Sequence, residues 1–342
     1  MRMVNPSKLG AAAALTLLTP WALAACGSEE TAATQAEPGA CPTAPVEVVV
    51  SVDQWGDIVS QLGGDCAQVR TVIAGSSVDP HDYEPAPSDA VVFEDAQLVV
   101  INGGHYDEWA AKLAATSAPE APLISAVDLA GGDDHEGHDH EGHDHGDHDH
   151  GHDHDGHDHD GHDHGSSNPH AWYRPATVHA MADAVTAELG NLAPEAREYF
   201  EARRAEFAER TAEYDALIER VRSEAAGKTY AATEAVFDDM AAAVGLQDRT
   251  PPGYQVAASN ETDPSPGDLA AFLTLLEDRG VDVLIVNTQT EGSMPAQLRS
   301  AAEAAGIPLV EVTETVAPGS DSFQAWQVDQ LTALAEALGV SA

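Results

Sequence analysis

Basic residues are scarce in this chain of 342 residues, in which 15 Lys and Arg stand against 58 Asp and Glu and give a formal charge of −43. Nucleic acids and anionic membrane surfaces are recognised through basic patches, so this balance argues against both as partners. An acidic chain suits cations, although acidity alone identifies no ligand. Hydrophobic residues still make up 43% of the chain, which allows two folded domains or one large one.

Long apolar runs are missing as well, except near the start. Two basic residues precede an apolar stretch over residues 9–25, which is too short for a spanning helix and ends in Leu23-Ala24-Ala25-Cys26. This pattern indicates a signal peptide over 1–25, and its end resembles the lipobox of bacterial lipoproteins, in which Cys26 is lipidated. The alternative is an ordinary secretory signal with a chance cysteine. We expect residues 26–45, which include three prolines, to form a polar tether.

Only three cysteines occur, and two of them follow the signal segment. Disulfides persist outside the cytoplasm. Cys41 precedes an expected strand at 46–52, and Cys66 follows an expected helix at 54–62. A helix that returns antiparallel to its strand ends beside the strand's start, so a bond between Cys41 and Cys66 is possible. Two unpaired thiols are the alternative.

Strand and helix patterns alternate along both halves of the chain. Runs such as Val283–Val286 are continuously apolar, as a sheet covered on both faces requires. We therefore expect an α/β fold of two lobes, 46–193 and 227–342, each with a largely parallel sheet flanked by helices. The expected strands are 46–52, 68–74, 97–103, 122–129, 228–233, 254–258, 281–288 and 308–313, and the expected helices are 54–62, 88–96, 106–116, 176–190, 236–244, 266–279, 295–305 and 322–338.

The longest helical pattern, 194–226, lies between the two lobes. Pro194 suits a first helical turn and Gly227 suits a stop. Phe200, Phe207 and Tyr214 recur every seven residues and form one apolar stripe. About 30 residues span roughly 45 Å at the rise of an α-helix. We expect one rigid helix that packs across both lobes; a coiled-coil arm is the alternative.

An insert over 131–167 holds 13 of the 17 histidines and 13 acidic residues, with no Lys or Arg. It has too few apolar residues to fold, so we expect a disordered loop. Its repeated His-Asp-His pattern predicts zinc binding, either as a collector or sensor for the main site or as an incidental property. The candidates in this auxiliary loop are His138, His140, His143, His145, His148, His150, His152 and His154.

Four further residues with metal-binding side chains follow expected strands, where open α/β sheets bind ligands. His81 follows 68–74, His170 follows 122–129 and the insert, and Glu234 and Glu314 come directly after 228–233 and 308–313. Two imidazoles and two carboxylates suit zinc, manganese or iron. With two residues from each lobe, the ion would lie in the cleft between them. Three other residues are candidates for polar partners around it: His105, Gln289 and Glu291.

Sequence motifs around these residues resemble those of one family, the metal-specific solute-binding lipoproteins of bacterial ABC importers for zinc and manganese. The similarity covers nearly all of 46–340. It rests on Asp79-Pro80-His81 with Tyr83-Glu84-Pro85, on Asn168-Pro169-His170-Ala171-Trp172, on Thr233-Glu234-Ala235-Val236-Phe237 and on Val312-Thr313-Glu314. The resemblance implies two lobes joined by a long rigid helix, His81, His170, Glu234 and Glu314 as metal ligands, and a permease with its ATPase as partners.

Two features of the sequence favour different metals. Zinc members of the family usually carry a third His where this chain has Glu234, whereas manganese members carry Glu, and the family more often has Asp where this chain has Glu314. The His-rich insert resembles the zinc branch, and imidazole binds zinc far better than manganese. We therefore expect Zn²⁺, with Mn²⁺ as the alternative.

We expect a binding protein and no enzyme, because four protein ligands leave no open position on the metal and the sequence has no H-E-x-x-H motif. It would be a monomer outside the cytoplasm, held at the outer face of the cell membrane by its lipid anchor alone, that captures zinc and delivers it to an ABC permease. The alternatives are a manganese-specific protein of the same type, a zinc hydrolase, and an extracellular zinc buffer or adhesin that works through the insert.

Overall fold

The structure is a computed structural model that describes residues 40–75, 81, 83–130, 168–260, 262–290 and 292–341. Several expectations lie outside the described residues: the signal segment, Cys26 and the tether up to residue 39, the His-rich insert, and Glu291. Among the described residues, no helix combines the length and apolarity that crossing a membrane requires.

The first lobe is built on a parallel sheet with the strand order β2-β1-β3-β4. Its strands are β1 (Val46–Val52), β2 (Ala67–Ile73), β3 (Leu98–Ile101) and β4 (Leu123–Ser125). The two central strands, β1 and β3, consist almost entirely of buried apolar residues because both of their faces are covered. In the register, Val48 pairs with Val69 on one side and with Leu98 on the other.

Helices connect these strands and cover the sheet. They are α1 (Asp53–Gly63), α2 (Pro87–Phe93), α3 (Glu108–Ser117), α4 (Ala126–Ala130) and α5 (Pro175–Leu192), with 3₁₀ turns η1 (Gly64–Cys66) and η2 (Ala171–Tyr173). Helix α1 runs back along β1, and the structure joins Cys41 to Cys66 by a disulfide bond near the amino end of that strand.

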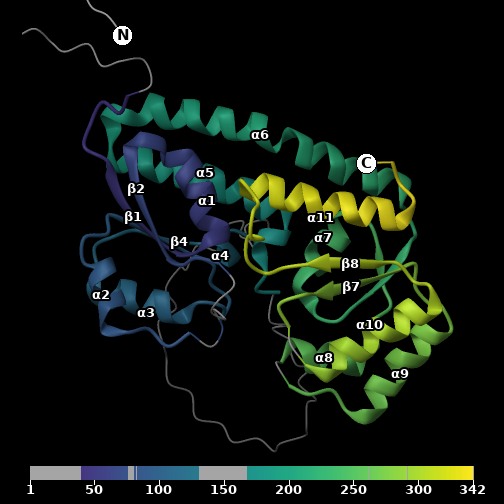
Figure 1. The fold of residues 1–342 in the computed structure, drawn as a ribbon. Coiled ribbons are helices and arrows are strands. Elements are labelled where there is room, and N and C mark those ends of the chain that lie inside the picture. Colours follow the sequence, from purple (N-terminus) through teal and green to yellow (C-terminus); the bar gives the residue numbers. More distant parts are fainter. Residues whose placement is uncertain are drawn as a thin grey trace, which may run out of the picture. The chain divides into compact units, whose positions relative to one another are not determined.

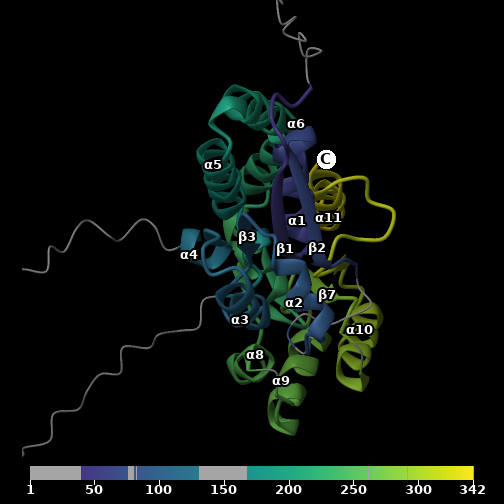
Figure 2. The same cartoon turned by 90° about the vertical axis from the view of Figure 1, so that its left-hand side faces the viewer.

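The second lobe repeats the arrangement with the strand order β6-β5-β7-β8, again parallel throughout. Its strands are β5 (Thr229–Ala232), β6 (Gln247–Asp248), β7 (Val283–Asn287) and β8 (Leu309–Val312). Its helices are α7 (Asp238–Ala243), α8 (Pro252–Ser259), α9 (Pro266–Glu277), α10 (Ser293–Ala305) and α11 (Phe323–Leu338), with the 3₁₀ turn η4 (Ala235–Phe237). Helix α9 packs between α8 and α10 (Figure 2).

Two expected strands need correction. Residues 254–258 belong to helix α8, not to a strand: Pro252 occupies the first helical turn, and the helix buries Tyr254 while Val256 faces solvent. The fourth strand of that sheet is the two-residue β6, whose exposed polar residues carry no strand pattern. The expected strand 122–129 ends at Ser125, and helix α4 follows at once.

Helix α6 (Arg197–Glu224), preceded by the 3₁₀ turn η3 (Pro194–Ala196), connects the two lobes (Figure 1). Its apolar stripe is buried as expected, with Phe200, Phe207 and Tyr214 at most 1% exposed. The helix packs on α1 and α5 of the first lobe and on α11 at the end of the second. One continuous buried cluster includes side chains from both lobes, among them Trp55, Trp172, Phe237 and Trp326. The expected fold class is therefore confirmed, including the long connecting helix.

Candidate metal centre

The sheet orders explain which residues can meet. In the second lobe β7 lies between β5 and β8, so the residues that end or follow these strands are neighbours: Glu234 after β5, Asn287 at the end of β7, and Glu314 after β8. After β5 the chain adds β6 on one side of that strand, and it then adds β7 and β8 on the other side. Open α/β sheets bind ligands at such a change in strand order. In the first lobe, His81 follows β2 and His170 lies just before η2.

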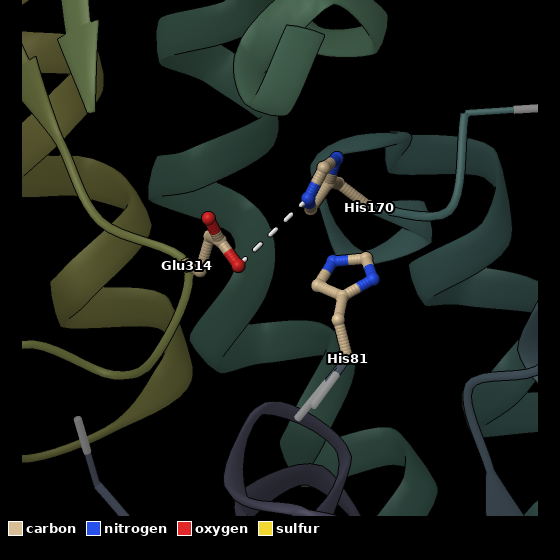
Figure 3. Close-up of side chains that lie close together, drawn as sticks. All are labelled: His81, His170 and Glu314. Carbon is tan, nitrogen blue, oxygen red and sulfur yellow. Dashed lines mark ion pairs between the residues drawn. The ribbon is translucent and has the colours of Figure 1, made fainter. Parts of the chain in front are cut away.

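Three of the four expected ligands come together. His81, His170 and Glu314 each offer a ligand atom, and these atoms all lie within 4.8 Å of one another. Nε2 of His170 is 3.9 Å from Oε2 of Glu314, and the carboxylate points toward both imidazole rings (Figure 3). The cluster is mostly shielded from solvent, because the side chains of His170 and Glu314 are 10% and 16% exposed. Imidazole nitrogen and carboxylate oxygen are the donors expected for zinc or manganese.

His170 is prepared to bind a cation through Nε2. Its Nδ1 lies 2.8 Å from the amide oxygen of Asn168, which can only accept, so Nδ1 carries the hydrogen and Nε2 carries the lone pair. Nε2 is buried and has no hydrogen-bond partner among the described residues. Burial, and secondly the charge of His81, lower the pKa of His170 to about 3. The ring is therefore neutral near pH 7, as metal binding requires.

Two buried aromatic rings pack against the histidines. The Tyr106 ring meets the His81 ring edge to face with centroids 4.6 Å apart, and the Trp172 ring meets His170 in the same way at 5.4 Å. Both aromatic side chains are fully buried. They restrict the orientation of the imidazoles and keep water from that side of the cluster. Trp172 belongs to one of the sequence motifs, whereas the role of Tyr106 was missed.

The backbone around Glu314 is held by side chains from both lobes. Gln289, which follows β7, accepts hydrogen bonds from the backbone N–H groups of Glu314 and Thr315 through its Oε1. Gln54, on α1 of the first lobe, donates its side-chain amide hydrogen to the carbonyl oxygen of Glu314. Tyr173 places its hydroxyl 2.6 Å from the carbonyl oxygen of Thr313. Glu314 is thus fixed by its main chain, and Gln289 lies where the sequence predicts a polar partner.

Glu234 is not part of the cluster of three but is connected to it. The amide nitrogen of Asn287 lies 2.6 Å from Oε2 of Glu234 and 2.7 Å from Oε1 of Glu314. Tyr254 also lies near Glu234: burial, and secondly the negative charge of Glu234, raise the pKa of Tyr254 to about 12. Asn287 was missed by the sequence reasoning. The one available signal was a polar residue at the end of the otherwise apolar strand β7.

His105 contacts a different residue, Glu108, and not the cluster. It adopts a left-handed backbone conformation with φ of 68°, its side chain is 85% exposed, and its Nδ1 pairs with Oε1 of Glu108 at the start of α3. The structure therefore does not bring His105 to the cluster, although the loop that precedes it contributes Asn102, whose Nδ2 donates to the carbonyl oxygen of Pro169 beside His170.

A known protein family matches most of the chain. The family described as "Zinc-uptake complex component A periplasmic", ZnuA, matches residues 48–337. The chain belongs to this family. The matched range contains the positions of the four expected ligands and nearly all of both sheets, so the resemblance to this family is confirmed.

Individual relatives bind either metal according to their names. The chain is 27% identical to the high-affinity zinc uptake system protein ZnuA of Bacillus subtilis over 77% of this chain and 76% of that protein. It is 30% identical to the manganese-binding lipoprotein MntA of Halalkalibacterium halodurans over a shorter stretch, 32% of this chain and 36% of that protein. Among solved structures, the periplasmic zinc-binding protein TroA of Treponema pallidum shares the fold with a TM-score of 0.67 at 15% identity, covering 86% of this chain and 99% of that one.

Proposed function

We propose that this protein captures Zn²⁺ outside the cytoplasm and delivers it to an ABC permease and its ATPase. The observation that carries the proposal is the cluster of His81, His170 and Glu314, whose ligand atoms lie within 4.8 Å of one another. His170 fits this role because its Nε2 is buried and its ring stays neutral. Membership of the zinc-uptake family supports zinc as the cargo.

His81, His170, Glu314 and Glu234 are the proposed ligands. The first three surround a common point, and Glu234 is one hydrogen-bonded side chain away from Glu314. Two imidazoles and two carboxylates form a formally neutral site around a divalent ion. Four protein ligands complete a closed zinc shell, which suits binding and release of an ion and leaves no position for an activated water. The protein then transports its ion and performs no chemistry on a substrate.

The anchor and the insert complete the proposal. Cys26 would carry the lipid that keeps the protein at the outer face of the cell membrane, as the lipobox-like sequence indicates. The His-rich segment would collect zinc and pass it to the ligands. It would be an accessory element that transport does not require.

Manganese is the second candidate, and Glu234 favours it, because a carboxylate is a harder ligand than the imidazole of zinc-type relatives. Elemental analysis of the full chain purified without chelator, followed by competition between Zn²⁺ and Mn²⁺, decides between the metals. We expect one tightly held zinc per chain in addition to metal on the insert. A single tightly held manganese under competition would overturn zinc as the cargo.

Replacement of both histidines tests the transport role. In cells limited for zinc, His81→Ala combined with His170→Ala should abolish growth support, whereas deletion of residues 133–164 should reduce it only slightly. The opposite result, growth that depends on the insert and not on the two histidines, would favour an extracellular zinc buffer over an importer component.

A further inference from the structure

Asn287 joins the two carboxylates of the metal centre through a single amide group. Its nitrogen lies 2.6 Å from Oε2 of Glu234 and 2.7 Å from Oε1 of Glu314. A primary amide has two N–H hydrogens. The nitrogen also lies 2.9 Å from Oγ1 of Thr290, so these hydrogens face three oxygens, of which the two carboxylate oxygens are the nearest. The sheet order explains the contact, because β7, which ends in Asn287, lies between the strands that precede Glu234 and Glu314. The residue is 3% exposed, so water does not compete for these bonds.

The orientation of this amide is fixed. Its oxygen accepts the backbone N–H of Gln289 at 3.0 Å, which directs the nitrogen toward the carboxylates. The backbone N–H of Asn287 donates to Oγ1 of Thr233, next to Glu234, at 3.2 Å. A flipped amide would place its oxygen against two carboxylates and lose these bonds. Asn287 is therefore a rigid double donor rather than a side chain that turns between partners.

We propose that Asn287 holds Glu234 and Glu314 to one metal-binding oxygen each and thereby sets the preference of the centre for zinc over manganese. The inference rests on the proposed function. One oxygen of each carboxylate accepts a hydrogen bond from the amide, and on Glu314 the other oxygen, Oε2, is the one that faces His170. Asn287 acts through the two carboxylates and is a positioning residue.

The consequence for metal choice follows from coordination number. One oxygen from each carboxylate and one nitrogen from each of His81 and His170 make four donors, the number that zinc takes in closed protein sites. Manganese favours six donors in octahedral arrangement, mostly oxygen. The two additional carboxylate oxygens that could supply this number are those that Asn287 retains. A glutamate at position 234, typical of manganese-binding relatives, is thus restricted to a coordination mode that suits zinc.

Two variants of the full-length chain test this. Asn287→Ala removes the double donor. Asn287→Asp keeps the side-chain size and an oxygen for the N–H of Gln289 but has no amide hydrogens, and it covers the case in which the alanine variant fails to fold. The matched control is Asn260→Ala in the same lobe, because Asn260 is exposed and its amide donates to the carbonyl oxygen of Val256, away from the carboxylates. The double variant His81→Ala, His170→Ala gives the baseline for metal held elsewhere on the chain.

The measurement is competition of metal-stripped protein with a chromophoric chelator for Zn²⁺ and Mn²⁺ separately, with X-ray absorption at the zinc edge. We expect the ratio of zinc to manganese affinity to fall at least about tenfold in both Asn287 variants, which corresponds to 1.4 kcal/mol, and to stay unchanged in Asn260→Ala. The zinc should gain oxygen neighbours beyond the four-donor shell of the parent.

Two outcomes overturn the inference in distinguishable ways. If both metals weaken equally and the zinc shell is unchanged, Asn287 supports the fold and does not set the metal preference, while the proposed function stands. If the double histidine variant binds zinc as tightly as the parent, the ligand set itself is wrong, and the proposed function fails together with the inference.

Discussion

The side-chain oxygen of Asn168 accepts the Nδ1 hydrogen of His170 across 2.8 Å. The same oxygen also accepts the backbone N–H of His170, and the amide nitrogen of Asn168 donates to the carbonyl oxygen of Ala235 at 2.7 Å. Ala235 directly follows Glu234 in the second lobe. One asparagine thus fixes the tautomer of His170, a proposed ligand from the first lobe, and connects this residue to the second lobe.

Asn168→Ala should lower zinc affinity by about 10–100-fold, the usual effect of removing a hydrogen-bond partner of a metal-binding imidazole. Competition with a chromophoric chelator measures this. Asn168→Asp is the matched control, because a carboxylate still accepts the Nδ1 hydrogen although it cannot donate to Ala235. We expect this variant to retain most of the affinity. Parent-like binding by Asn168→Ala would mean that another group sets the tautomer of His170.

The low pKa of His170 predicts a pH dependence of stability in the metal-free protein. The pKa of His170 is about 3 in the folded protein and 6.5 when it is unperturbed. Between these values the unfolded state binds a proton that the folded state does not, so the free energy of unfolding falls as pH falls below 6.5. From pH 6.5 to pH 5 the loss is roughly 2 kcal/mol.

Denaturant unfolding of the metal-stripped chain at pH 6.5 and pH 5 measures this effect. The comparison protein is His170→Gln, which keeps the other titrating groups, so their contributions cancel in the difference. The parent should lose roughly 2 kcal/mol more than the variant between the two pH values. Equal losses would show that His170 titrates normally in the folded protein.

Features that depend on local pattern could be predicted from the sequence. A valine-rich run indicated β1, a continuous apolar run indicated β7, and the seven-residue recurrence of Phe200, Phe207 and Tyr214 indicated α6. Each of these signals lies within a single element. The proximity of His81, His170 and Glu314 was predictable because carboxyl ends of parallel strands converge. The edge strand β6 was not predictable, because its two residues are polar and exposed and their pairing with β5 depends on the sheet.

Contacts between segments that are distant in the sequence could not be predicted from local sequence patterns. Asn287 is separated by 53 residues from Glu234 and by 27 from Glu314, and the bond from Gln54 to the carbonyl oxygen of Glu314 spans 260 residues. A polar residue that ends an apolar strand has many possible partners, and only the strand order selects them. His105 is a similar case. It follows β3, and residues that follow other strands do reach the site, but its left-handed backbone conformation and its pair with Glu108 leave its side chain exposed.

The disulfide should contribute to stability but not to metal binding. Cys41 and Cys66 lie 25 residues apart in sequence, so in the chain-entropy model the bond stabilises the protein by about 3.5 kcal/mol, because it restricts the unfolded chain. It lies near the amino ends of β1 and β2, whereas the proposed ligands follow the carboxyl ends of strands. The variant Cys41→Ser, Cys66→Ser should therefore unfold at lower denaturant concentration with zinc affinity unchanged. A marked loss of zinc affinity would show that the bond also shapes the ligand loops.

Glu234 offers the sharpest test of how many ligands the centre uses, because the structure groups only His81, His170 and Glu314 within 4.8 Å and connects Glu234 through Asn287. If Glu234 completes the shell, Glu234→Ala should weaken both zinc and manganese at least about tenfold, a cost of 1.4 kcal/mol or more.

Glu234→His should favour zinc further, because imidazole ranks zinc above manganese more strongly than a carboxylate does. Calorimetric titration of both variants in chains lacking residues 133–164 removes the competing histidines of the insert, and Glu303→Ala on α10 controls for the loss of an exposed negative charge in the same lobe. Parent-like binding of both metals by Glu234→Ala would leave a centre of three ligands. Glu234 would then serve only as the second acceptor for Asn287, and the fourth position on the ion would belong to water.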